Sequence, residues 1–103
     1  MSKYVRLMAD FCSSAVWDEN GTNIDIDDVP MHYWLKSMIT QWQAWYDREG
    51  DTQDFDYKTF SKHGFALAYK LKQNLPDWTV VYFDEAASYE GKPRSEYQKE
   101  IIL

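Results

Sequence analysis

The chain has 103 residues, a hydrophobic fraction of 45% and a formal net charge of −6. This length allows one domain with its own core, which we expect to span residues 1–103, and the apolar content excludes a disordered chain. The acidity argues against nucleic-acid and anionic-membrane ligands, because both need positive potential at the contact, and it favours a basic partner.

The only cysteine is Cys12, which excludes an internal disulfide framework and fits a reducing compartment. No apolar run approaches the roughly 20 residues that a membrane helix needs. We therefore expect a cytoplasmic protein that does not contact a membrane.

The first half of the chain predicts a strand, a long loop and a helix. Apolar and polar residues alternate over residues 3–11, which is the pattern of a strand, and residues 12–29 then lose this pattern. The sequence Asp27-Asp28-Val29-Pro30 is a helix-start signal, and the helix should run to about Arg48. We expect Gly50 to close the helix in a left-handed conformation.

This helix should carry one apolar face. Its predicted core stripe, at three- and four-residue spacing, is Met31, Trp34, Leu35, Met38, Ile39, Trp42, Trp45 and Tyr46. Gln43 falls on the face that we assign to solvent.

The second half predicts a helix and two strands. The helix begins near Asp56 or Tyr57 and ends before Pro76. The run Trp78-Thr79-Val80-Val81-Tyr82-Phe83-Asp84-Glu85 is rich in β-branched and aromatic residues and should be the central strand. Residues 95–102 alternate again and should fold back beside it as an edge strand.

The predicted order is β-α-α-β-β, which corresponds to an α/β (α+β) fold with a small mixed three-stranded sheet and two helices on one side. The direction of the first two strands depends on the loop at residues 12–29. A simple turn would make them antiparallel, whereas a loop that travels the length of the sheet would make them parallel. The length of the loop favours the parallel arrangement.

Acidic residues gather at residues 10–28, 47–56 and 84–90, whereas residues 57–75 contain four lysines and no acid. Such charge runs are usually solvated surfaces, and this interpretation stays open. Aromatic residues beside the acids favour a binding surface for a basic protein, since aromatic side chains provide affinity and carboxylates speed encounter. The predicted partner-binding residues are Trp17, Asp18, Glu19, Asp25, Asp47, Asp51, Asp84 and Glu85.

Catalytic and metal sites have less support in the sequence. The pairs Asp27-Asp28 and Asp84-Glu85 could be acid–base couples, but adjacent residues on a strand face opposite sides. The span from Asp18 to Asp28 has its glycine at the fourth position, where a calcium loop has it at the sixth. Cys12 lies in no motif of a nucleophile with its base. We expect no catalytic residue, no metal and no cofactor.

Two stretches, Met8-Ala9-Asp10-Phe11-Cys12-Ser13-Ser14-Ala15-Val16-Trp17-Asp18 and the run from Trp78 to Glu85, resemble those of small acidic bacterial proteins. In size, acidity and aromatic content the chain is similar to the immunity proteins that neutralise contact-dependent growth-inhibition (CDI) toxins. The resemblance implies an immunity protein that binds a basic toxin domain, such as a nuclease, one to one and occludes its active site. It supplies no binding residues, so those named above rest on the charge pattern.

Two other functions remain open. The surplus of aromatic residues also fits a small intracellular adaptor or a homo-oligomeric interaction protein, which would show a mass in solution well above that of one chain. A small hydrolase built on carboxylates would lose its activity on an acid-to-amide change without unfolding.

Overall fold

In the computed structural model, which describes residues 3–103, four strands form one sheet in the order β2-β1-β3-β4. The central pair, β1 (Tyr4–Leu7) and β3 (Thr79–Phe83), is parallel. The outer strands are both antiparallel to their neighbours: β2 (Val16–Trp17) pairs with β1, and β4 (Gln98–Glu100) pairs with β3.

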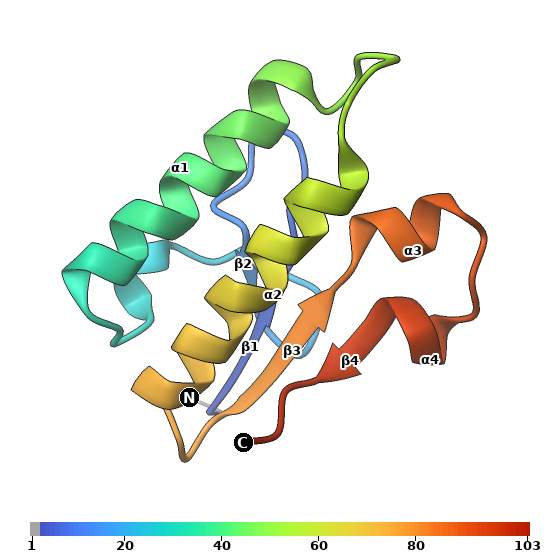
Figure 1. The fold of residues 1–103 in the computed structure, drawn as a ribbon. Coiled ribbons are helices and arrows are strands. Elements are labelled where there is room, and N and C mark those ends of the chain that lie inside the picture. Colours follow the sequence, from blue (N-terminus) through green and yellow to red (C-terminus); the bar gives the residue numbers. More distant parts are fainter. Residues whose placement is uncertain (1–2) are drawn as a thin grey trace.

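Two long helices, α1 (Tyr33–Glu49) and α2 (Tyr57–Asn74), lie side by side over one face of this sheet (Figure 1). A 3-10 turn, η1 (Ile26–Asp28), precedes α1. Two short helices, α3 (Glu85–Tyr89) and α4 (Arg94–Tyr97), carry the chain from β3 round to β4 (Figure 1).

The core lies between the sheet and the two long helices. Because side chains alternate along a strand, Val5 and Leu7 of β1 share one face with Val80 and Tyr82 of β3, and all four are fully buried. The helices contribute the fully buried side chains of Leu35, Ile39, Phe60, Ala68 and Leu71. Tyr82 is the largest fully buried side chain, so the central strand organises the packing.

The structure confirms the predicted α/β class, the order of the main elements, and the parallel direction of β1 and β3. It adds one strand and two short helices to the predicted elements. Strand β2 lies within the predicted loop at residues 12–29, and its two residues are too few to show an alternating pattern. Helices α3 and α4 are likewise shorter than the window in which helical periodicity becomes visible. The strand predicted at residues 95–102 is therefore partly wrong, because its first residues belong to α4, and Glu85 of the predicted central strand begins α3.

The predicted start of the first helix is wrong by about one turn. The carboxylate of Asp25 accepts a hydrogen bond from the amide of Asp27 at 2.9 Å and caps η1, so the acidic start signal begins a 3-10 turn. Helix α1 itself begins at Tyr33, after Pro30.

Three assignments on α1 also need correction. Gln43 is only 4% exposed, whereas Trp34 and Met38 of the predicted core stripe are 39% and 41% exposed. Gly50 has a right-handed φ of −61°, so it is not required for a left-handed closure. Glycine is favoured there because a Cβ atom would lie 2.6 Å from the carbonyl oxygen of Tyr46.

Candidate functional site

The carboxyl ends of the parallel strands β1 and β3 meet at one edge of the sheet, which we call the carboxyl edge. From there the chain continues to Asp10 after β1, and to Asp84 and Glu85 after β3. The last turn of α1 reaches the same edge (Figure 1). The carboxylate of Asp47 in this turn accepts a hydrogen bond from the amide of Cys12, in the segment that follows β1. Residues from all three acidic stretches therefore meet where ligands commonly bind to parallel sheets.

Glu85 is the most perturbed carboxyl group at this edge. It is partly buried at the start of α3, and burial, followed by the charges of Asp10 and Asp84, raises its pKa to about 7. Burial and the charge of Glu85 also raise the pKa of Tyr46 to about 12 and move the pKa of Tyr57 in the same direction. A cationic group of a partner placed beside Glu85 would favour its ionised form.

Gln43 holds the segment after β1 against α1. Its side-chain amide donates to the carbonyl oxygen of Asp10 at 2.6 Å and to the carboxylate of Asp47 at 3.1 Å. Its side-chain oxygen accepts from the amide of Asp10 at 3.3 Å. Asp47 in turn accepts from the amide of Cys12 at 3.0 Å. The position of Asp10 is thus fixed by a buried side chain.

Asp84 has a structural role at the carboxyl edge. Its carboxylate accepts from the hydroxyl of Ser61 at 2.5 Å, and from the amides of Ala86 and Ala87 at 3.0 and 3.4 Å. It therefore caps α3 and ties this helix to α2. A charge reversal at Asp84 would change the fold as well as the surface.

Four rings form a continuous series beside the acidic groups, which we call the aromatic ladder. The ring centroids of Trp45 and Phe55 are 5.7 Å apart, those of Phe55 and Tyr57 4.7 Å, and those of Tyr57 and Tyr89 4.9 Å. Tyr89 is 76% exposed and stacks on Tyr57. The ladder leads from α1 across the α1–α2 connection to α3 and ends in an exposed aromatic surface.

Of the other predicted site residues, Asp51 lies on the side of the carboxyl edge, whereas Trp17, Asp18, Glu19 and Asp25, which caps η1, do not join this group. Trp17 pairs with Arg6 on β1, and the chain after it runs back toward the start of β1, so Asp18 and Glu19 lie at the opposite edge of the sheet. There they line a hollow of about 320 Å³ with Tyr4 and Trp78. The predicted surface therefore divides between two edges.

Individual contacts explain several of these positions. The Asp18 carboxylate accepts from the amides of Asn20 and Thr22, each at 2.9 Å, and shapes the turn after β2. The indole of Trp17 donates to the carbonyl oxygen of Met8 at 2.9 Å. Asp51 is exposed in the connection between α1 and α2, on the side of the carboxyl edge.

Four residues of the carboxyl edge were not predicted: Asp10, Tyr57 and Tyr89 on the surface, and Gln43, which supports Asp10. Gln43 follows Ile39 by four residues and precedes Tyr46 by three, a spacing that places it on the core face of α1. This spacing was the available signal. The stacking of Tyr89 on Tyr57 joins residues far apart in sequence and has no such signal.

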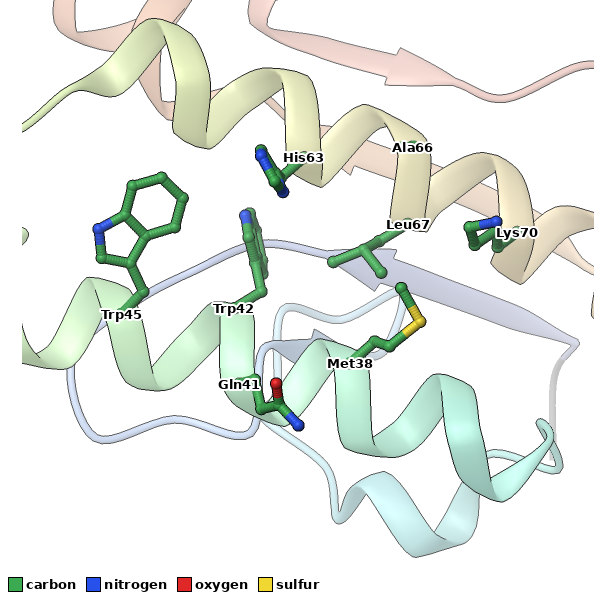
Figure 2. Close-up of a pocket in the computed structure, with 8 residues that line it drawn as sticks. All are labelled: Met38, Gln41, Trp42, Trp45, His63, Ala66, Leu67 and Lys70. Carbon is green, nitrogen blue, oxygen red and sulfur yellow. The ribbon is translucent and has the colours of Figure 1, made fainter.

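A second feature without a sequence signal is a groove of about 290 Å³ between α1 and α2, on the side away from the sheet, which we call the outer groove (Figure 2). Its lining residues are Met38, Gln41, Trp42, Trp45, His63, Ala66, Leu67 and Lys70. Trp34 lies next to it, because the ammonium of Lys70 is 5.9 Å from the centroid of the Trp34 ring. The exposure of Met38 and Trp34 follows from this groove.

Within residues 3–103 we find no group of three or more histidine, cysteine or acidic side chains arranged to hold a metal ion. Over the same residues, no helix combines the length and the apolar character needed to cross a membrane.

Comparison with known proteins gives one informative match. No curated protein matches the chain significantly. The model of a protein family described as Serratia CdiI immunity protein-like matches residues 3–85, which include β1, both long helices, β3 and the two stretches that carried the resemblance. This match confirms the resemblance to CDI immunity proteins. It covers most of the sequence, and the chain therefore belongs to the Serratia CdiI immunity protein-like family.

Proposed function

We propose that this protein binds a basic toxin domain through the carboxyl edge and neutralises it by covering its active site. Membership of a CDI immunity family supports a toxin as the partner. The observation that carries the choice of surface is the convergence of Asp10, Asp47 and Glu85 beside the aromatic ladder. The complex contains one copy of each chain and forms in the cytoplasm.

The chemistry of this edge suits a cationic partner. Burial raises the pKa of Glu85, and the charges of Asp10 and Asp84 raise it further, so a lysine or arginine side chain placed beside Glu85 would offset both effects. The exposed ring of Tyr89 provides apolar and π surface next to these charges, which favours an arginine through stacking. Carboxylates at the rim speed encounter with a positive partner.

A nuclease is the toxin class that fits this surface best. A nuclease presents positive potential where it binds phosphate groups, so its substrate cleft is the natural complement of an acidic edge. Occupation of that cleft excludes the nucleic acid by competition. This mechanism needs no chemical step by the immunity protein.

The test is a charge reversal at each edge of the sheet. Asp51→Lys changes the carboxyl edge and Glu19→Lys the opposite edge; both residues are exposed, and the two changes in net charge are equal. Surface plasmon resonance with the toxin domain encoded by the neighbouring gene measures the association rate over a series of salt concentrations. We expect Asp51→Lys to slow association by about threefold at low salt, with less effect at high salt and little effect of Glu19→Lys.

Equal effects of the two reversals would show that only net charge matters, and the carboxyl edge would then be the wrong surface. Occlusion is tested separately, by adding a labelled oligonucleotide to the toxin with and without saturating immunity protein. If the complex still binds the oligonucleotide with the affinity of the free toxin, the active site is not covered.

A further inference from the structure

The outer groove is an apolar feature that the carboxyl edge leaves unused. Figure 2 shows the side chains of Met38 and Trp42 on α1 opposite Leu67 on α2, with Lys70 at one end and Trp45 at the other. Its volume of about 290 Å³ lies at the lower limit of small-molecule sites, roughly 300 Å³, and suits a side chain with its immediate neighbour.

The charges around the groove define what can enter it. The lining residues include Lys70 and His63 but no aspartate or glutamate. Lys70 is half-buried, and its ammonium group lies over the ring of Trp34. Among residues 3–103 the ion pairs are Lys36 with Asp27 and Arg48 with Glu49, so Lys70 has no carboxylate partner there. A carboxylate from outside would meet a partly desolvated cation, where an ion pair is stronger than in water.

A second copy of this chain is a poor occupant. Helix α2 contains no acidic residue, and the acids of α1 lie in its last turn, away from Lys70. Packing the outer grooves of two copies against each other would bring cationic side chains such as Lys70 together, with no carboxylate of α1 or α2 between them. A dimer that packs groove against groove is therefore disfavoured, and the occupant that fits best presents an acidic group beside an apolar one.

The groove is also connected to the carboxyl edge. Trp45 lines the groove, and its ring contacts Phe55, the second ring of the aromatic ladder. The ladder then continues through Tyr57 to Tyr89 at the acidic groups. Phe55 itself is buried, so the rings that a partner can contact are the partly exposed Trp45 at the groove and the exposed Tyr89 at the acidic groups.

We propose that the outer groove receives an apolar side chain of the toxin partner that lies next to a carboxylate. The apolar group packs between Met38 and Leu67, and the carboxylate pairs with Lys70. The inference rests on the proposed function for the identity of the partner, and it adds a second, oppositely charged contact to the binding surface.

Two substitutions on α2 test the groove, each with a matched control outside it. Ala66→Phe fills the groove from an exposed position, and Gln73→Phe adds the same ring at an exposed position outside it. Lys70→Glu reverses the charge at the end of the groove, and Lys3→Glu makes the same change at an exposed position before β1, away from the groove and from the carboxyl edge. Calorimetric titration with the toxin domain encoded by the neighbouring gene gives the dissociation constants, and circular dichroism verifies folding.

We expect Ala66→Phe and Lys70→Glu to weaken binding at least about tenfold more than their controls. In the wild-type protein, NMR of ¹⁵N-labelled indole groups should show the Trp42 and Trp45 signals shifting on binding. If either groove variant binds within about twofold of its control, or if both indole signals stay in place, the proposal is wrong. The wild-type titration separates this failure from failure of the proposed function. If the wild-type protein binds the toxin domain, only the groove proposal is wrong; if the wild-type protein does not bind the toxin domain, the proposed function is wrong as well.

Discussion

The hydroxyl group of Tyr82 lies directly against Gly64, so the Tyr82 side chain fills the space between the central strand β3 and the backbone of α2. A Cβ atom on Gly64 would lie 2.2 Å from the hydroxyl oxygen of Tyr82 and 2.6 Å from its ring Cζ atom. The same hydroxyl donates to the carbonyl oxygen of Ser61 at 3.4 Å. Gly64 therefore sets the distance between helix and strand in the middle of the core.

Replacing Gly64 by alanine should destabilise the protein. The clash with Tyr82 costs about 2 to 3 kcal/mol of overpacking, which exceeds the gain of about 1 kcal/mol in helix propensity. Urea unfolding measures the change. Gly91→Ala is the control. Its Cβ would meet open space, so only the left-handed backbone conformation, with a φ of +77°, should lower the free energy of unfolding, by about 1 kcal/mol. A more stable Gly64→Ala protein would contradict the packing described.

Gln43→Ala should lower the free energy of unfolding by about 2 kcal/mol. It leaves the carbonyl oxygen of Asp10 without its hydrogen-bond donor, and it leaves a cavity between α1 and the segment after β1. Hydrogen exchange should also accelerate at the amides of Asp10 and Cys12, which lie in the segment that Gln43 holds. Gln41→Ala, at an exposed position on the same helix, should change stability by less than about 0.5 kcal/mol. Equal effects of the two substitutions would show that the buried hydrogen bonds contribute nothing.

Glu85 should make stability depend on pH. Its pKa is about 7 in the folded chain against a usual value of 4.5, so the folded state binds more protons than the unfolded state between these values. The free energy of unfolding therefore falls as the pH rises from 4.5 to 7, and the loss is complete above pH 7. Glu85→Gln should remove this loss and stabilise the protein by about 2 kcal/mol at pH 8, with little effect at pH 4.

Urea unfolding at pH 4 and pH 8 tests this prediction. Glu90→Gln removes an exposed glutamate just after α3 and serves as the control, since it should leave the pH dependence unchanged. If Glu85→Gln retains the wild-type difference between the two pH values, Glu85 does not hold its proton in the folded state.

Tyr89 and Tyr33 form a matched pair of exposed rings, at 76% and 80% exposure. Tyr89→Ala should weaken toxin binding by about fivefold to thirtyfold, or 1 to 2 kcal/mol, because it removes the end of the aromatic ladder at the proposed contact. Tyr33→Ala, at the start of α1, should leave binding unchanged. Both should alter stability by less than about 1 kcal/mol. A loss of affinity from Tyr33→Ala alone would place the contact elsewhere.

The main elements of the fold could be predicted because their patterns are local. The alternation in β1, the dense apolar run of β3 and the helix start at Asp56 each lie within one short window of sequence. Strand β2 could not be found this way, because it is formed by pairing with β1 rather than by a pattern of its own. The start of α1 was misplaced because Asp25 and its neighbours satisfy a 3-10 turn as readily as a longer helix.

The site was only partly predictable for a related reason. The carboxylates at Asp47, Asp84 and Glu85 could be named from charge, but their grouping depends on the parallel pairing of β1 and β3. Asp18 and Glu19 look equivalent to them in the sequence, yet the antiparallel turn after β2 carries these two residues to the other edge. Charge density alone could not separate the two groups, because distance in space is set by topology.

The parallel pairing of β1 and β3 also has a consequence for how the protein is made. Tyr4 pairs with Thr79, so both long helices must leave the ribosome before the first strand finds its central neighbour. Closing a sheet across so long a chain is slow compared with forming helices, and the unpaired strand is exposed in the meantime. A newly synthesised chain thus gains its carboxyl edge only after β1, both long helices and β3 have all left the ribosome.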